Sequence, residues 1–263
     1  MTYFAPNDHI GIQTQFSRAA AMYDNHCQIG KKVIQQNIAY LLPTCTNMSE
    51  VTILDLGCGT GLFAKEIQHH LNTATIYQCD IAPSMASEAF NHNTNTFIAD
   101  IHQLPIRKES FTHLVSHMAL QWTHLSEELF TQLNSYLKPG GHALFAFPTQ
   151  GTLHELSESF EAIGLKPPVN NFISNQKLTS LFSCINTIPT ISEHHYTSHH
   201  ADIIDLMRHF KSLGANHLYT PSGNMLTKQK LGKANSYYIN RYGNNKTINA
   251  SWNISFVQWR KAQ

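Results

Sequence analysis

The sequence predicts an α/β fold whose sheet is mostly parallel, and three observations support this prediction. Strand-like and helix-like segments alternate over residues 51–149, which is typical of a parallel sheet with helices on both faces. A glycine-rich turn joins the first strand directly to a helix, and an aspartate stands at the end of each of the first three strands. Open sheets of this kind bind ligands at the carboxyl ends of their strands.

The core at 51–149 provides the predicted strands in order, at 51–56, 74–79, 96–99, 111–116 and 142–147. Each segment is short, contains β-branched or aromatic residues and is bounded by turn residues. A helix is predicted over 127–137. It should stop at Lys138-Pro139-Gly140-Gly141, because this combination of residues is typical of a turn.

Helical segments flank this core on both sides. Residues 1–42 contain two helical patterns, at 11–23 and 26–42, which predict an N-terminal cap over the ligand crevice. Residues 150–245 contain several helix-like stretches and one strand-like interval, and we interpret them as a lid and substrate region. A last strand is predicted at 250–261. We therefore expect a single domain over 1–263.

Composition sets limits on the class of protein. Hydrophobic residues make up 42% of the chain, which is typical of a globular protein. No apolar run reaches the roughly 18 residues of a membrane span, and no secretory signal is visible at the N-terminus. The five cysteines have no Cys-x-x-Cys spacing and resemble the reduced cysteines of a cytoplasmic protein. We expect a cytoplasmic protein without a membrane partner.

The net charge of +1 hides an asymmetry. Residues 201–263 contain nine Lys and Arg residues but only two acids, Asp202 and Asp205. A basic face of this kind can attract an acidic partner. An ordinary solvated surface is the alternative interpretation, and the charge pattern alone does not separate the two.

Metal, hydrolase and nucleic-acid functions are weakly supported. The 17 histidines include adjacent pairs, whose side chains point in different directions on a strand or helix, so we expect no metal site. A serine hydrolase would need a Gly-x-Ser-x-Gly turn, which the chain lacks. The basic C-terminal part has aromatic neighbours, but its charge is modest, and we expect no nucleic-acid partner.

The glycine-rich turn follows Ile53-Leu54-Asp55-Leu56 with glycines at 57, 59 and 61. A dinucleotide-binding fingerprint would need a further glycine at 62, where the chain has Leu62. The tighter spacing of Gly57, Gly59 and Gly61 after an acid resembles motif I of the class I S-adenosylmethionine (SAM) methyltransferases. This resemblance implies that the turn and Asp55 hold the methionine end of SAM.

The same resemblance gives roles to the residues at the ends of the next strands. Asp80 would accept hydrogen bonds from both ribose hydroxyls, a task for which a carboxylate is suited. The predicted adenine neighbours are Ile81, Met85, Asp100 and Ile101, and Ser116 is predicted near the sulfonium side of the cofactor. Either later aspartate alone could be a surface residue, but three acids at three successive strand ends are less easily explained by chance.

Motifs outside the turn are more specific. They are Phe16-Ser17-Arg18-Ala19-Ala20-Ala21-Met22-Tyr23-Asp24, Ser116-His117-Met118-Ala119-Leu120-Gln121-Trp122, Gly151-Thr152-Leu153-His154-Glu155-Leu156 and Leu213-Gly214-Ala215-Asn216. Together they resemble the malonyl-[acyl-carrier protein] O-methyltransferases of biotin synthesis, over about residues 12–231. The resemblance implies a Rossmann-like class I methyltransferase sheet with an antiparallel last strand, a helical cap and a helical lid insertion.

It also implies a reaction. Enzymes of this family use SAM to methylate the free carboxylate of a malonyl thioester on an acidic acyl-carrier protein, and they use no metal. We expect catalytic roles for Tyr23, Arg18 and Gln121, with Trp122 beside the substrate. Arg208 and Lys211, on one flank of a helix predicted at 201–213, would contact the carrier protein.

The chain departs from the family pattern at two positions. Thr112 stands where an acid is usual, and His117 replaces a usual asparagine. Three alternatives remain open at this point. They are a methyltransferase of another small carboxylic acid, a methyltransferase of RNA or protein, and a catalytically silent SAM-binding module.

Overall fold

The computed structural model describes residues 9–46, 48–185, 187–215, 226–244 and 247–263, and these residues form one mixed sheet covered by helices. The strands are β1 (Thr52–Leu56), β2 (Thr75–Asp80), β3 (Thr96–Ile98), β4 (Phe111–His117), β5 (Leu137–Pro148), β6 (Thr190–His200), β7 (Gly243–Asn244) and β8 (Thr247–Arg260). Their order is β3-β2-β1-β4-β5-β8-β6, with β7 paired to β8 outside that order. Strands β1 to β5 run parallel, whereas β8 is antiparallel to β5 and β6 to β8. The predicted fold class is confirmed.

Burial along the strands follows from their place in the sheet. All five residues of β1 are buried, because this central strand is covered on both faces. Exposure alternates along β6, which forms an edge of the sheet and has one face toward solvent. On that strand, His195 and His199 point outward and contact Asn253 and Asn249 of β8 at 2.8 Å.

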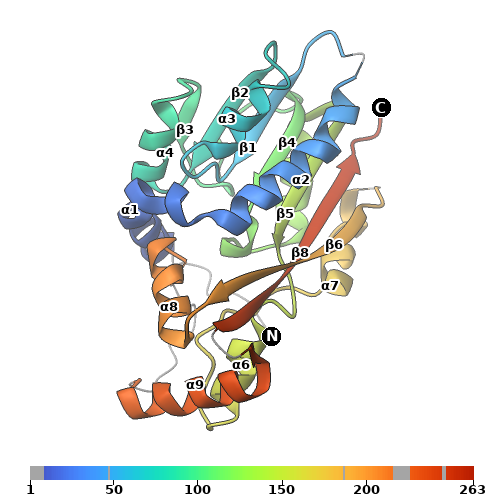
Figure 1. The fold of residues 1–263 in the computed structure, drawn as a ribbon. Coiled ribbons are helices and arrows are strands. Elements are labelled where there is room, and N and C mark those ends of the chain that lie inside the picture. The colour runs from blue at the N-terminus through green and yellow to red at the C-terminus, as the bar shows by residue number, and fades with distance from the viewer. Residues whose placement is uncertain (1–8, 47, 186, 216–225, 245–246) are drawn as a thin grey trace.

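Helices cover both faces of the sheet (Figure 1). On one face, α2 (Gln28–Cys45) and α3 (Leu62–Gln68) pack their apolar residues on β1, β4 and β5. On the other face, the sheet is covered by α5 (Glu127–Tyr136), α7 (Asn175–Ser180) and the short turn η2 (Ser183–Ile185). The helix α4 (Pro83–Phe90) lies beside β2 and β3.

The remaining helices lie beyond the carboxyl ends of the parallel strands (Figure 1). The cap helix is α1 (His9–His26), and a short turn, η1 (Leu120–Trp122), follows β4. The lid helices are α6 (His154–Glu161), α8 (Ile203–Ser212) and α9 (Lys228–Tyr242). A second apolar core joins these lid helices to the first half of β8, with Phe160, Leu206 and Tyr238 fully buried within it.

One predicted turn is wrong. The helix α5 ends at Tyr136, and the segment Lys138-Pro139-Gly140-Gly141 belongs to β5. Its backbone is paired with the end of the chain, because the N–H of Gly140 donates to the carbonyl of Lys261 and the N–H of Lys261 donates to the carbonyl of Gly141. This long-range pairing extends the strand through residues whose types are typical of a turn.

No helix among the described residues is long and apolar enough to cross a membrane. Over the same residues, no group of three or more His, Cys, Asp or Glu side chains is placed to hold a metal ion.

Candidate functional site

The glycine-rich turn leaves β1 and enters α3 through three left-handed residues. Gly57, Gly59 and Gly61 have φ values of +70°, +56° and +82°, a region that costs other residues about 1–2 kcal/mol. The N–H of Gly57 donates to the carbonyl of Cys79 at 2.8 Å, and the N–H of Gly59 donates to Asp80 Oδ2 at 2.9 Å. The turn is thus fastened to the end of β2.

The three glycines differ in the space around them. A Cβ atom at Gly57 would lie 2.3 Å from the Cβ of Ala119, and one at Gly61 would lie 3.1 Å from a side chain of α4. A Cβ atom at Gly59 would meet only the ring of Tyr23, at 3.9 Å. The middle of the turn therefore faces an open space that extends toward α1.

Asp80 and Asp100 border this space. Asp80 also accepts the N–H of Ala82 at 2.8 Å, whereas Asp100 accepts the N–H of His102 at 2.9 Å. Burial raises the pKa of Asp80 to about 6, although its two backbone donors pull the pKa down again in part. Asp80 is therefore mostly ionised at pH 7.

Asp55 lies deeper than the other two acids. Its side chain is 2% exposed, and its Oδ1 lies 3.6 Å from Nδ1 of His117. Its Oδ2 is buried without a hydrogen-bond partner among the described residues. Such an oxygen is costly to leave unpaired, and a donor on a bound cation would satisfy it.

A pocket of about 770 Å³, here called the turn pocket, opens beside the glycine turn. Its lining includes the predicted cofactor residues Gly57, Gly59, Asp80, Ile81, Met85, Asp100 and Ile101. An adjoining space of about 370 Å³ is lined by Asp55 and shares Gly57, Gly59 and His117 with the turn pocket.

A second pocket of about 810 Å³, here called the lid pocket, lies between α1, α8 and the first half of β8. The two pockets share Phe16, Tyr23, Met118 and Trp122. No Asp, Glu, Lys or Arg lines the lid pocket within the described part of the chain. One of its histidines, His209, has its pKa lowered by burial to about 4 and is therefore neutral at pH 7.

Tyr23 stands where the two pockets meet. Burial raises the pKa of its hydroxyl well above the usual value, and the side chain of Cys27 and the nearby carboxylates add to the effect. The hydroxyl therefore keeps its proton at neutral pH. Tyr23 can donate a hydrogen bond, but it cannot act as a base.

The wall next to Tyr23 contains a strained residue. Met118 has φ +54°, and its N–H donates to the carbonyl of Ala146 at 2.8 Å. The side chain of Gln121 donates to the carbonyl of Met118 at 2.7 Å, so its Nε2 is fixed and its Oε1 is buried. Trp122 packs edge-to-face on Phe16, with ring centroids 5.4 Å apart, and so joins this wall to the cap.

Three residues predicted at the cofactor or reaction site line neither pocket nor the space beside Asp55, namely Arg18, Ser116 and Gly61. Arg18 is exposed and lies on the side of α1 that faces Pro83 and Ser84. It is five residues from Tyr23, which is about 140° around a helix axis. Ser116 is fully buried, and its hydroxyl donates to the carbonyl of Leu56 at 2.8 Å within the sheet.

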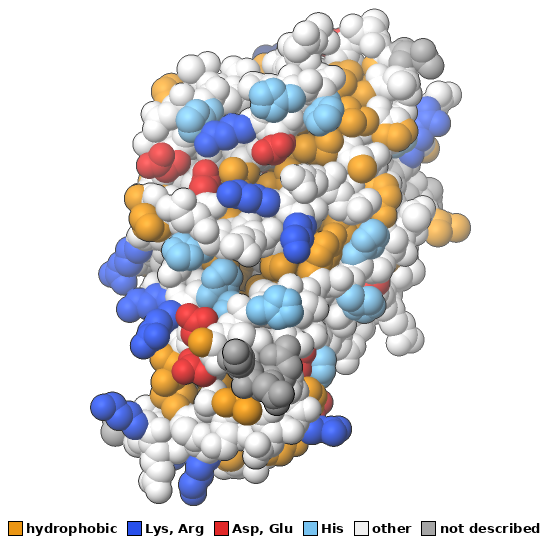
Figure 2. All heavy atoms as spheres, viewed as in Figure 1, with side chains coloured by type: hydrophobic (Ala, Val, Ile, Leu, Met, Phe, Trp, Pro, Cys, Tyr) orange, Lys and Arg blue, Asp and Glu red, His pale blue; other side chains and the backbone are white. Residues whose placement is uncertain are grey.

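Arg208 and Lys211, which are predicted to contact a carrier protein, are exposed on α8. Figure 2 shows Lys and Arg side chains over the side of the molecule where α1 and α8 lie. Between these two residues, His209 and Phe210 turn inward and line the lid pocket. The cationic side chains thus lie close to the lid pocket but outside it.

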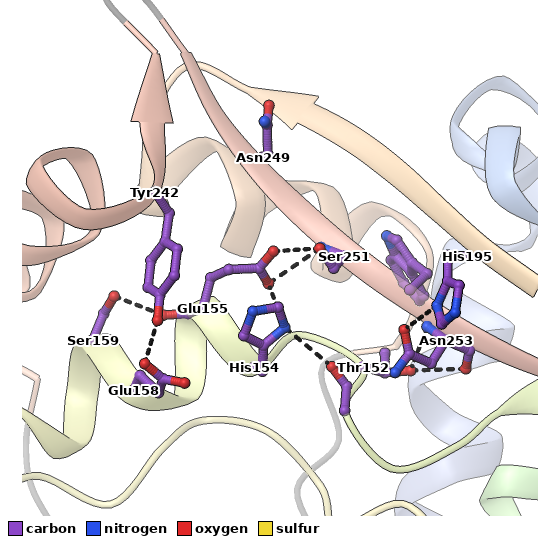
Figure 3. Close-up of polar contacts among 12 residues, drawn as sticks. Thr152, His154, Glu155, Glu158, Ser159, His195, Tyr242, Asn249, Ser251 and Asn253 are labelled. Carbon is purple, nitrogen blue, oxygen red and sulfur yellow. Dashed lines mark hydrogen bonds and ion pairs between the residues drawn. The ribbon is translucent and has the colours of Figure 1, made fainter.

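The segment that follows β5 is attached to strand β8 by side-chain hydrogen bonds (Figure 3). The hydroxyl of Thr152 donates to the carbonyl of Asn253 at 3.0 Å and accepts its N–H at 3.1 Å. Glu155 accepts the N–H of Ser251 at 3.2 Å and also the hydroxyl of that residue. These contacts position Trp252, which lies between the two anchored residues and lines the lid pocket.

The lid also contacts the cap directly. Gly214, with φ +69°, follows α8, and a Cβ atom there would lie 2.8 Å from the carbonyl oxygen of Gln15 and 2.9 Å from the Cα of Phe16. Glycine is required for this close approach. The neighbouring motif residue, Asn216, lies outside the described residues.

The two departures from the family pattern have different surroundings. Thr112 is buried between β4 and β1, where its hydroxyl donates to the carbonyl of Thr52 at 2.9 Å and accepts its N–H at 2.8 Å. It lines neither pocket. His117 lines the turn pocket and contacts both Asp55 and Asn37 of α2. Sequence reasoning missed Asn37, because no local pattern connects α2 with the end of β4.

Comparisons with known proteins show which family and which fold the chain resembles. Residues 54–145 match a family model described as a methyltransferase domain. The malonyl-[acyl-carrier protein] O-methyltransferase of Buchnera aphidicola subsp. Baizongia pistaciae is 32% identical over 222 residues, covering 84% of this chain and 87% of that protein.

Solved structures share the fold at low identity. The YcgJ protein of Bacillus subtilis has a TM-score of 0.60 at 13% identity, with 87% of this chain and 99% of that chain covered. Geranyl diphosphate C-methyltransferase of Streptomyces coelicolor, solved with S-adenosyl-L-homocysteine, has a TM-score of 0.51 at 12% identity, with 87% and 79% covered. At these identities the likeness concerns the fold alone.

Proposed function

This chain belongs to the family of the malonyl-[acyl-carrier protein] O-methyltransferases, and from this membership we propose that it methylates the malonyl group carried by acyl-carrier protein. The enzyme is a SAM-dependent methyltransferase, and its acceptor would be the free carboxylate of the malonyl thioester. The product would be a methyl ester, which removes the negative charge from the end of the chain. Within the family, this step begins the pimeloyl part of biotin.

The observation that supports this proposal most is the meeting of two differently charged pockets at Tyr23. The turn pocket is bordered by Asp80 and Asp100, with Asp55 in the space beside it, and negative charge favours a sulfonium cofactor. The lid pocket has no acid among its described lining residues, so it does not repel a carboxylate. Donor and acceptor would meet at the shared wall.

The residues of the turn pocket fit SAM. The unpaired Oδ2 of Asp55 would accept from the amino group of the methionine part. Asp80 would accept from the ribose hydroxyls, while Ile81 and Met85 would pack on the adenine. The carboxylate of Asp100 and the N–H of Ile101 would hold the adenine edge.

When bound, SAM supplies the methyl group, whose bond to sulfur breaks as a bond to a substrate oxygen forms. No base is required, because a carboxylate with a pKa of roughly 4 is already ionised at pH 7. The chain's own residues must hold the oxygen about 3 Å from the methyl carbon and exclude water. A mostly apolar lid pocket suits this task.

Tyr23 would orient the acceptor carboxylate by donating a hydrogen bond from its neutral hydroxyl. Gln121 would support the wall by holding Met118 in its strained conformation. Its buried Oε1 is an acceptor and would not pair with a carboxylate, so we assign it no direct contact with the reacting oxygen. Trp122 would close the space between the two pockets.

The carrier protein would dock on the outer side of α8. Arg208 and Lys211 are exposed there, and the residues between them line the lid pocket. An acidic carrier would be attracted to these cations while its prosthetic arm enters the pocket.

Turnover of malonyl-acyl-carrier protein with SAM tests the proposal, with intact mass of the carrier reporting a gain of one methyl. Malonyl-CoA and acetyl-acyl-carrier protein serve as controls. Tyr23→Phe should reduce kcat/KM by roughly 10- to 100-fold, since it removes one hydrogen bond to a charged group.

Two results would contradict the proposal. Equal methylation of malonyl-CoA or a free dicarboxylate would favour a methyltransferase of another small acid. Binding of SAM without any methylated product would favour a silent SAM-binding module.

A further inference from the structure

Asp55 faces a histidine whose other ring nitrogen is controlled by a third residue. Nδ1 of His117 lies 3.6 Å from Asp55 Oδ1, and its Nε2 lies 3.0 Å from Nδ2 of Asn37. The same Nδ2 donates to the carbonyl of Leu144 at 3.0 Å. Asn37 and Asp55 are 1% and 2% exposed, so water does not replace these contacts.

The carbonyl of Leu144 determines where the protons are. A carbonyl oxygen only accepts, so the amide atom of Asn37 that faces it must be the NH₂ group. The second hydrogen of that NH₂ group then points at Nε2 of His117, which must hold its lone pair there. The ring proton is therefore on Nδ1, facing Asp55.

A second proton on His117 is disfavoured by the same contact. It would place an N–H of the ring against an N–H of Asn37 in a buried position, where neither could find another partner. The ring of Phe63 stacks on His117 with centroids 4.8 Å apart, which limits rotation of the imidazole away from this arrangement. The contact with Asn37 therefore opposes protonation of Nε2.

The other groups around His117 leave the charge of Asp55 uncompensated. Tyr23, Cys27 and Cys58 line the same space, and burial raises the pKa of each, so all three are neutral at pH 7. Asp80, on the other side of the glycine turn, is a second carboxylate. Among the described residues lining this space and the turn pocket, there is no Lys or Arg.

We propose that Asn37 is a positioning residue for the cofactor, because it keeps His117 neutral and so reserves the negative charge of Asp55 for the amino group of SAM. This inference rests on the proposed function. It also explains how the chain accommodates histidine at a position where the family usually has asparagine. The imidazole introduces a group that can become a cation beside Asp55, and Asn37 prevents that cation from forming.

The same helix and strand supply a matched control. Two turns along α2, Thr44 Oγ1 lies 3.0 Å from Nε2 of His113, which is four residues before His117 on β4. Neither Thr44 nor His113 lines a pocket described above. Thr44→Val removes a comparable contact between a side chain and an imidazole without touching the site.

Binding of S-adenosylhomocysteine, which has the same amino group as SAM, tests the proposal by calorimetry between pH 6.5 and 8.5. Asn37→Asp places an oxygen against both Nε2 and the carbonyl of Leu144. Its carboxylate draws a proton onto His117, which then competes for Asp55. We expect about tenfold weaker binding at pH 6.5, corresponding to loss of one charge-assisted contact, and a smaller deficit at pH 8.5. Thr44→Val should bind as the wild type does.

The double variant Asn37→Asp/His117→Asn separates charge from structural damage. It should lose the added pH dependence, because no imidazole remains to be protonated, whereas a loss caused by the contact of the new carboxylate with the carbonyl of Leu144 would remain at every pH. An added pH dependence that persists in the double variant, or a deficit of Asn37→Asp that is equal at all pH values, would overturn the proposal.

Nitrogen chemical shifts of His117 in the unmodified protein give a test that needs no variant. We expect the neutral Nδ1–H tautomer throughout this pH range, and an Nε2–H tautomer or an imidazolium would overturn the proposal. If the wild type bound no S-adenosylhomocysteine, the proposed function itself would fail, and the inference with it.

Discussion

The turn pocket and the lid pocket share the wall of Phe16, Tyr23, Met118 and Trp122, but the side chains beyond that wall differ in charge. Aspartates border the turn pocket, whereas the described lining of the lid pocket contains no Asp, Glu, Lys or Arg. A cation is stabilised on one side, and an anion is not repelled on the other. This partition of charge, more than any one side chain, would favour the proposed transfer of a methyl group from a sulfonium to a carboxylate.

The largest expected effect is that of Gly57→Ala on cofactor binding in the turn pocket. Its Cβ would lie 2.3 Å from that of Ala119, in a left-handed residue, so the turn must move. We expect cofactor affinity to fall by at least about 100-fold, because the clash adds to a conformational penalty of roughly 1–2 kcal/mol. Calorimetry with S-adenosylhomocysteine measures the effect, and circular dichroism checks the fold.

Gly59→Ala is the comparison for that variant. It has the same left-handed strain but no clash with the protein, since its nearest neighbour would be Tyr23 at 3.9 Å. The Cβ at Gly59 would point into the turn pocket, so a loss of affinity there would come from strain and from contact with the cofactor. Circular dichroism should show a disturbed fold in Gly57→Ala alone, and an intact fold in both variants would show that packing against Ala119 does not matter. If both variants bound normally, the turn would not be the cofactor site.

Lowering the pH should reversibly reduce the affinity of the turn pocket for the cofactor. The pKa of Asp80 is raised by burial to about 6, and only the ionised form can accept from both ribose hydroxyls while keeping its backbone contacts. Cofactor affinity should therefore fall as pH decreases from 7 to 5, by about tenfold. Asp80→Asn should bind weakly with a flatter profile, and an affinity of the wild type that is constant over this range would contradict the assignment.

The smallest expected effect is that of the exposed cations of α8 on the KM for the carrier protein. Arg208→Glu with Lys211→Glu should raise KM for malonyl-acyl-carrier protein several-fold at low salt, since exposed charges each contribute about 0–1 kcal/mol. High salt should reduce the difference. The KM for malonyl-CoA serves as the control, and a salt-independent KM for the carrier in the wild type would argue against docking on α8.

Sequence reasoning succeeded where function depends on the ends of strands. Asp80 and Asp100 border one pocket, with Asp55 in the space beside it, because the carboxyl ends of neighbouring parallel strands meet at one edge of the sheet. The strand segments of the core and the mostly parallel sheet followed from the sequence pattern, and the antiparallel last strand followed from the family resemblance.

The sequence was a poorer guide to the direction in which a side chain points and to contacts between residues far apart in the chain. Ser116 and His117 are neighbours on β4, and their side chains point to opposite faces, so only one can reach the turn pocket. Arg18 and Tyr23 differ in a similar way around α1. Asn37 could not be predicted, since its role depends on contacts with residues distant in sequence.

The contact of Gly214 with the backbone of Gln15 and Phe16 has a thermodynamic consequence. Phe16 belongs to the wall of both pockets, so any movement of the end of α8 would act on that shared wall. A ligand that moved this wall on entering one pocket would change the free energy of filling the other. Such coupling is reciprocal, so each ligand would change the affinity for the other by the same factor.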